Sequence, residues 1–169
     1  RTWHPTKAPN EYKSVSCIVQ DTRPGHTNVW YYGTGEAEGA SASETGAYYF
    51  GDGIYKSVDS GKTWNKLAST ASHLTSFDHW SDIVWNIAID PSDMANDKIY
   101  VAAYGAIYRS TDSGHTWAPV LGTLGTAQYS DVAVTHTGAV YASLSSDGPN
   151  GGIYRSADGV SFVKITPSW

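Results

Sequence analysis

Two segments of the chain concentrate the side chains that could bind a ligand or move a proton. The first runs from residue 34 to residue 52 and contains three Glu, two Tyr and one Phe. The second runs from residue 69 to residue 82 and contains two His, two Asp, one Phe and one Trp. Carboxylates beside aromatic rings suit sugars, because the C–H faces of a sugar stack on rings while its hydroxyls donate to carboxylate oxygens.

Paired carboxylates are also the acid/base machinery of glycoside hydrolysis, where the two groups lie about 5 to 10 Å apart. Glu36 and Asp82 are the candidates for that catalytic role. The remaining candidates would bind the ligand, with Tyr49 and Trp80 as stacking surfaces; they are Tyr48, Tyr49, His73, Asp78, His79 and Trp80. Because both segments are acidic, they favour a neutral or basic glycan over an anionic one.

Other uses of the same residues remain open. His73, Asp78, His79 and Asp82 have metal-binding side chains, but their spacing matches no zinc or calcium loop, so neither a metal nor a cofactor is predicted. Asp82 and Asp131 each follow a Ser at the start of a predicted strand. That repetition favours a shared structural role, such as holding a loop through its backbone N–H groups, over catalysis. The two segments could also pack against a neighbouring domain.

The strands that must position these segments are repeated along the chain. The phrase Ile-Tyr-basic-Ser occurs at residues 54–57, 107–110 and 153–156. The first two copies continue as Ser-x-Asp-x-Gly-x-Thr-Trp, and the third continues with the same phrase one residue shorter, ending in Ser-Phe. The residues that form these phrases are Ser57, Asp59, Gly61, Thr63, Trp64, Ser110, Asp112, Gly114, Thr116, Trp117, Ser156, Asp158 and Phe162.

A tight reversal between two strands explains this choice of residues. The Asp carboxylate can accept backbone N–H groups inside the turn, and the Gly can adopt a positive φ. The aromatic residue then starts the return strand and covers the hairpin as an apolar plug. These requirements favour a structural role over a catalytic one for Asp59, Asp112 and Asp158.

The repeated phrase resembles the Asp-box, or BNR repeat, of the β-propeller superfamily that includes sialidases, sortilin-type Vps10 domains and xyloglucan-degrading hydrolases. Its spacing is close to the period of about 40 to 50 residues that propeller blades show. The resemblance covers nearly the whole chain and implies an all-β fold of three four-stranded antiparallel blades, at residues 11–68, 82–121 and 129–166, within a larger propeller. Residues 1–10 would end a preceding blade.

The resemblance also has implications for function. It implies that the Asp-boxes lie on the face of the propeller opposite the ligand, and that the protein is secreted or displayed at the cell surface, with a targeting signal outside this chain. Sialidases clamp their substrate with three arginines, and the arginines here are not placed for that role, so sialidase activity is disfavoured. Two functions remain: a carbohydrate-active propeller, which is either a glycoside hydrolase or a glycan-binding module, and a sortilin-like protein-interaction scaffold.

Composition and fold limit the partners. The net charge of −5, with both signs mixed along the chain, provides no basic stripe for a phosphate backbone, so nucleic acid is not an expected partner. No apolar stretch approaches the roughly 20 residues of a membrane span. Three blades leave two open flanks, so the remaining blades of a propeller, in the same or another chain, are expected partners beside a glycan or a protein.

Overall fold

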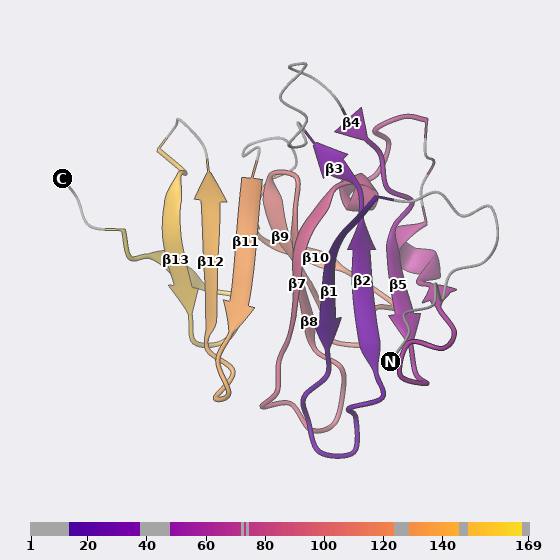
Figure 1. The fold of residues 1–169 in the computed structure, drawn as a ribbon. Coiled ribbons are helices and arrows are strands. Elements are labelled where there is room, and N and C mark those ends of the chain that lie inside the picture. Colours follow the sequence, from indigo (N-terminus) through magenta and orange to yellow (C-terminus); the bar gives the residue numbers. More distant parts are fainter. Residues whose placement is uncertain are drawn as a thin grey trace, which may run out of the picture.

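The computed structural model describes residues 14–37, 48–71, 73, 75–123, 129–145 and 149–166. In this part of the chain the structure confirms the expected all-β fold, because three four-stranded antiparallel sheets account for most of the regular structure (Figure 1). The possible blade end at residues 1–10 lies outside the described residues. We call the three sheets the first, second and third blades.

Each blade is an antiparallel meander whose four strands follow one another in the chain. The first blade contains β1 (Val15–Gln20), β2 (Trp30–Thr34), β5 (Ile54–Ser57) and β6 (Asn65–Lys66). The second contains β7 (Val84–Ile89), β8 (Ile99–Ala103), β9 (Ala106–Ser110) and β10 (Ala118–Gly122). The third contains β11 (Tyr129–Val134), β12 (Val140–Ser145), β13 (Gly152–Ser156) and β14 (Phe162–Lys164).

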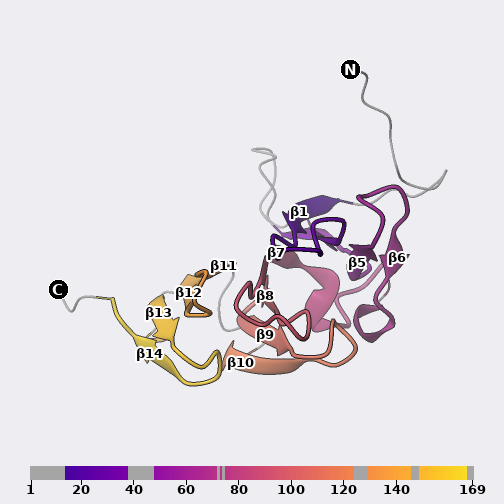
Figure 2. The same cartoon turned by 90° about the horizontal axis from the view of Figure 1, so that it is seen from below.

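The blades are arranged as an arc. The first strands of the three blades, β1, β7 and β11, lie side by side along its inner edge, and the last strands, β6, β10 and β14, lie along its outer edge (Figure 2). The strands of each blade run between two edges of the sheet. The second and fourth strands end at one of these edges, which we call the loop end. The turns after the first and third strands lie at the opposite end, which we call the turn end.

Hydrophobic side chains between adjacent blades hold the arc together. The core between the first two blades includes Tyr31 and Ile54 from one sheet and Val84 and Val101 from the other. A second core joins the second and third blades. Its residues Tyr100, Ala102 and Ile107 alternate with those of the first core along β8 and β9, and the third blade adds Val132, Val140 and Ala142. The alternation follows from the two-residue period of a strand, which presents successive side chains to opposite faces.

The repeated phrases form the hairpin turns between the third and fourth strands. In the second blade the Asp112 carboxylate accepts the Thr116 backbone N–H at 2.9 Å and the Thr116 hydroxyl at 2.6 Å, and the Ser110 hydroxyl accepts the Gly114 N–H at 2.9 Å. Gly114 has a φ of 88°, a conformation that favours glycine. The Thr116 hydrogen bonds are the main reason that the pKa of Asp112 falls to about 2.

The other two turns use the same chemistry. Asp59 of the first blade accepts from Thr63 at the same two distances, 2.9 and 2.6 Å. The third turn is one residue shorter, and there the Asp158 carboxylate accepts the backbone N–H groups of Val160 and Ser161 instead. In all three turns the carboxylate is occupied by its own loop, so these residues shape the hairpin.

We expect Ser110→Ala to lower the free energy of unfolding by about 1 to 2 kcal/mol, because it leaves the buried Gly114 N–H without its acceptor. Thr111→Ala, at the neighbouring exposed position, is the matched control and should leave stability unchanged. Urea denaturation of both variants measures the difference. Equal stability of the two variants would contradict the turn-forming role.

The connections at the loop end contain structure that the sequence did not predict. Residues 34–52 include a small hairpin of β3 (Glu36–Ala37) and β4 (Tyr48–Tyr49). The connection from the first to the second blade includes two short 3-10 helices, η1 (Ala68–Thr70) and η2 (Trp80–Asp82). Among the described residues, no helix is long and apolar enough to cross a membrane.

Candidate functional site

The two candidate segments meet at the loop end, as expected from the topology. The Gly51 backbone N–H donates to the Asp82 carbonyl at 2.7 Å. Gly35 lies against the same carbonyl, and a Cβ atom at Gly35 would overlap it. Gly35 also has a φ of 94°, so both its conformation and its surroundings require glycine. This close backbone approach joins the β3–β4 connection to η2.

Asp82 holds the loop before the second blade. Its side chain is fully buried, and Oδ2 accepts the backbone N–H groups of Asp78 and His79 at 2.7 Å each. These hydrogen bonds agree with the loop-holding role that the sequence suggested as the alternative to catalysis. Asp131 does not share that role: it lies within β11, is exposed, and accepts the Asn86 side chain at 2.6 Å.

Two further candidates of η2 are engaged in local packing. The Trp80 ring stacks on Tyr108 with centroids 4.1 Å apart and meets Trp117 edge-on at 5.4 Å. Trp80 is half-buried against the core between the first two blades. His79 caps η2, with Nδ1 lying 2.6 Å from the Ser81 hydroxyl. These contacts place Trp80 in the interface between blades instead of on an open stacking surface.

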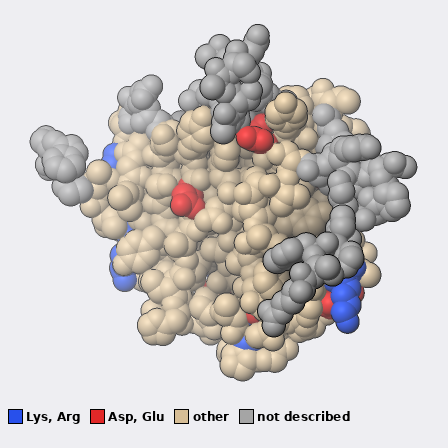
Figure 3. Space-filling view, in the orientation of Figure 1, with Lys and Arg blue, Asp and Glu red and all other residues tan. Residues whose placement is uncertain are grey.

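Glu36 and Tyr49 lie opposite each other on the β3–β4 hairpin. Glu36 is half-buried and accepts the Ser14 hydroxyl at 3.2 Å, while Tyr49 is 59% exposed. Acidic side-chain atoms are visible over β3 in Figure 3, on a face that otherwise carries few charges. Tyr48 lies in β4, and Glu38 and Glu44, the other glutamates of this segment, lie outside the described residues.

His73 and Asp78 form an exposed pair at the rim of the loop end. His73 Nδ1 lies 2.7 Å from Asp78 Oδ2, and the two side chains are 80% and 40% exposed. The hydrogen bond from His73 is the main reason that the pKa of Asp78 falls below its usual range. Asp78 is therefore a charged hydrogen-bond acceptor that is accessible from solvent.

An apolar cavity of about 210 Å³ lies between the two segments. Its walls are Phe50, Phe77, Ile83 and Tyr104. The Phe77 ring lies 6.3 Å from that of Phe50 and 5.5 Å from that of Tyr104, and Phe77 is 38% exposed. Sequence reasoning noted Phe77 in its segment but missed Tyr104, which comes from the tight β8–β9 turn.

This arrangement can bind a ligand that has both an apolar face and hydroxyl or amino groups. Aromatic rings form the walls of the cavity, while Asp78 follows Phe77 directly in the chain and Tyr49 directly precedes Phe50. A sugar ring combines those properties, because one of its faces is formed by C–H groups and its edge by hydroxyls. Among the residues that the structure describes, Asp78 is the one candidate acid at this site that is both charged and exposed.

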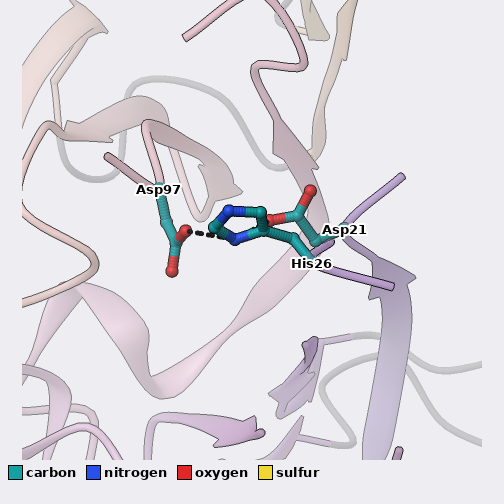
Figure 4. A group of neighbouring side chains, drawn as sticks. All are labelled: Asp21, His26 and Asp97. Carbon is teal, nitrogen blue, oxygen red and sulfur yellow. Dashed lines mark ion pairs between the residues drawn. The ribbon is translucent and has the colours of Figure 1, made fainter. Parts of the chain in front are cut away.

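A second cluster of titratable groups lies at the turn end. Asp21, His26 and Asp97 are close enough to hold a metal ion, and Figure 4 shows the imidazole between the two carboxylates. Arg23 already fills the place of a cation, because its guanidinium donates to Asp21 at 2.5 Å and also to Asp97. Lys56 makes a further ion pair with Asp97 at 2.7 Å. The donor set therefore fits a buried ion network better than a metal.

Comparison with known proteins gives structural similarity without close sequence similarity. No protein-family model and no curated protein matches the sequence. The structure is similar to YCF48 from Cyanidioschyzon merolae, with a TM-score of 0.59, 16% identity and coverage of 95% of this chain. It is also similar to the GH74 xyloglucanase from Xanthomonas campestris, with a TM-score of 0.58, 21% identity and coverage of 89% of this chain. An ancestral GH74 enzyme matches with a TM-score of 0.62, 19% identity and coverage of 90% of this chain.

These similarities show the propeller fold. This chain spans 39% of the YCF48 chain, 22% of the Xanthomonas xyloglucanase and 20% of the ancestral enzyme. Its three blades therefore correspond to part of each of those propellers.

Proposed function

We propose that this chain is part of an extracellular propeller of the Asp-box, sialidase-like superfamily that binds a neutral or basic glycan at its loop end. The aromatic cavity formed by Phe50, Phe77, Ile83 and Tyr104 is the observation on which this proposal rests. It lies where the two segments predicted to bind ligand come together. Two of the similar structures are GH74 enzymes, one of them a xyloglucanase, and this agrees with a carbohydrate ligand.

Phe77 and Tyr104 would carry the stacking role that the sequence suggested for Trp80. Their rings meet at an angle of 74°, so they form a corner against which a sugar ring could rest. Tyr49 and Asp78 would contact the ligand from the rim, since both are exposed. The exposed Asp78 carboxylate favours neutral or amino sugars, because an anionic sugar would meet like charge.

The surroundings of Asp82, which would act with Glu36 in hydrolysis, favour glycan binding over hydrolysis. An acid/base residue must come within about 3 Å of the proton that it transfers. Asp82 is fully buried, and its Oδ2 is held by two backbone N–H groups of its own loop. We therefore assign Asp82 a positioning role, in which it fixes the backbone around Asp78 and His79, next to the cavity wall at Phe77 and Ile83.

We expect Phe77→Ala to weaken glycan binding by about tenfold, since stacking of one ring contributes on the order of 1.5 kcal/mol. Isothermal titration with neutral β-glucan oligosaccharides and chitosan oligosaccharides, and with sialylated oligosaccharides as the anionic comparison, measures the affinity. Met94→Ala is the matched control, because Met94 is an exposed apolar residue at the turn end. The control should bind as the natural protein does.

Absence of binding to any of these oligosaccharides would overturn the glycan proposal. Equal binding by Phe77→Ala and the natural protein would overturn the assignment of the cavity. If glycans do not bind, and a peptide with apolar side chains binds in a Phe77-dependent manner, the protein-interaction scaffold is the correct alternative.

A further inference from the structure

Every blade carries the same pair of side chains on the face that turns toward the next blade. A Tyr of the second strand is paired in register with a basic residue of the third strand. The pairs are Tyr31 with Lys56, Tyr100 with Arg109, and Tyr141 with Arg155. Since the pair recurs at the same register in three repeats, its surroundings can be compared from blade to blade.

In the first blade the pair binds a carboxylate of the second blade. The Lys56 ammonium lies 2.7 Å from Asp97 Oδ2, and the Tyr31 hydroxyl donates to the same oxygen at 2.8 Å. The ammonium also lies 5.2 Å from the centre of the Tyr31 ring. Asp97 comes from the turn between β7 and β8, so this contact fastens the first blade to the turn end of the second.

In the second blade the pair is covered by the third blade. Tyr100 is 1% exposed and belongs to the core that the second and third blades share. Its hydroxyl lies against Gly159 of the third repeated turn, where any Cβ atom would overlap it. Arg109 is half-buried beside it. Both pairs that have a following blade are therefore enclosed by that blade.

The pair of the third blade is open to solvent. Tyr141 is 38% exposed, and the exposed Arg155 guanidinium lies 5.9 Å from the centre of its ring. Ile153 and Val163 share this sheet face by register and are 50% and 67% exposed. The third blade forms one end of the arc (Figure 2). Within the described part of the chain, Arg155 has no ion-pair partner.

We propose that this face of the third blade is the docking surface of a further four-stranded propeller blade, and that Tyr141 and Arg155 bind a carboxylate which that blade presents at the position of Asp97. The occupant is identified by the two equivalent faces, each of which is covered by a blade. The similar solved propellers are longer than this arc, which spans 20 to 39% of their chains. An acidic partner group is favoured because the equivalent Lys56 of the first blade binds Asp97, and a guanidinium can bind a carboxylate through two parallel N–H donors.

A repeat extension tests this proposal directly. Lys66 and Lys164 are equivalent, because each pairs with the Tyr of the Ile-Tyr-basic-Ser strand. The extended protein therefore consists of residues 1–164 followed by a second copy of residues 67–123, which places a second Asp97 opposite Arg155. Hydroxyl-radical footprinting by mass spectrometry reports the accessibility of Tyr141, Ile153 and Val163 in the natural and the extended protein.

We expect modification of these three side chains to fall several-fold in the extended protein. Asp97→Asn in the added copy alone, and Arg155→Met, should each lower the thermal midpoint of the extended protein. Arg155→Met should leave the thermal midpoint of the natural protein unchanged. This difference separates a contact between Arg155 and the added blade from a general structural role of Arg155. The same variants leave the loop end untouched, so glycan binding reports on the proposed function independently.

Three results would overturn the proposal. The first is unchanged hydroxyl-radical modification of Tyr141, Ile153 and Val163 in the extended protein. This includes the case in which the added copy remains sensitive to protease because it has not folded against the third blade. The second is an identical effect of Arg155→Met in both proteins. The third is protection of the face in the natural protein at concentrations where sedimentation shows a dimer, because a second copy would then be the occupant.

Discussion

Replacing Arg23 by Met is expected to lower the free energy of unfolding by about 3 to 5 kcal/mol, because it leaves the buried Asp21 carboxylate without its arginine counter-ion and leaves Asp97 with Lys56 alone. Arg23 and Asp21 are fully buried, and the guanidinium donates to Asp21 and to Asp97. Arg23 also donates to the backbone carbonyl of Asn96 at 2.7 Å, so it joins the β1–β2 turn of the first blade to the β7–β8 turn of the second. Its loss would therefore weaken the contact between two blades.

Chemical denaturation at neutral pH measures this effect. The matched control is His73→Ala, which removes a side chain that pairs with an Asp at an exposed site and should leave stability nearly unchanged. An Arg23→Met variant as stable as the control would contradict the role of the network.

The pH dependence of the natural protein provides a second readout of the same network. Burial opposes ionisation of Asp97, but hydrogen bonds from Lys56 and Tyr31 outweigh it and lower its pKa from 3.8 to about 2. A carboxyl group with a lowered pKa in the folded state stabilises the fold above its unfolded pKa, and this contribution disappears as the pH falls from 3.8 toward 2. Lys56→Met should reduce that part of the acid dependence.

The fold could be predicted because its signals are local and repeated. The turn Ser-x-Asp-x-Gly-x-Thr satisfies its own backbone groups, so this seven-residue pattern predicts a hairpin wherever it occurs. The flanking strands then follow from the two-residue alternation of buried side chains. The last strand of the first blade, β6, has only two residues, and it still completes the expected four-stranded meander.

The chemistry of the loop end could be predicted only in part. That the two segments meet follows from topology, and the contact between Gly51 and Asp82 agrees with it. Whether a given side chain turns toward solvent or toward the backbone depends on tertiary contacts that have no local signal. The Asp82 side chain points inward and accepts two backbone N–H groups. Tyr104 lines the cavity from the β8–β9 turn, whose sequence contains no signal for ligand binding.

The ion network at the turn end shows the same limit. Arg23 and Asp97 lie 74 positions apart and come from turns of two different blades. Each is an ordinary polar residue of a surface turn when the sequence is considered alone. Their pairing becomes visible only when the first two blades are packed side by side, and no periodicity in the sequence reports that juxtaposition.

Trp80→Ala is expected to lower the free energy of unfolding by about 3 kcal/mol while the folded protein keeps its affinity for a ligand at the loop end. Truncating a packed Trp removes apolar contacts and leaves a cavity, which costs about 3 to 5 kcal/mol for a buried ring, and the lower value applies because Trp80 is half-buried. The ring contacts that would be lost are those with Tyr108 at 4.1 Å and Trp117 at 5.4 Å.

Phe77→Ala is the natural counterpart of this variant, because the two aromatic residues lie three positions apart in one connection but meet different surroundings. Phe77 lines the cavity and is 38% exposed, so its truncation should weaken binding with little loss of stability. Urea denaturation and titration with the same oligosaccharide, performed on both variants, separate the two roles. If Trp80→Ala abolished binding at full stability, Trp80 would be a ligand-stacking residue, and its assignment to the interface between blades would be wrong.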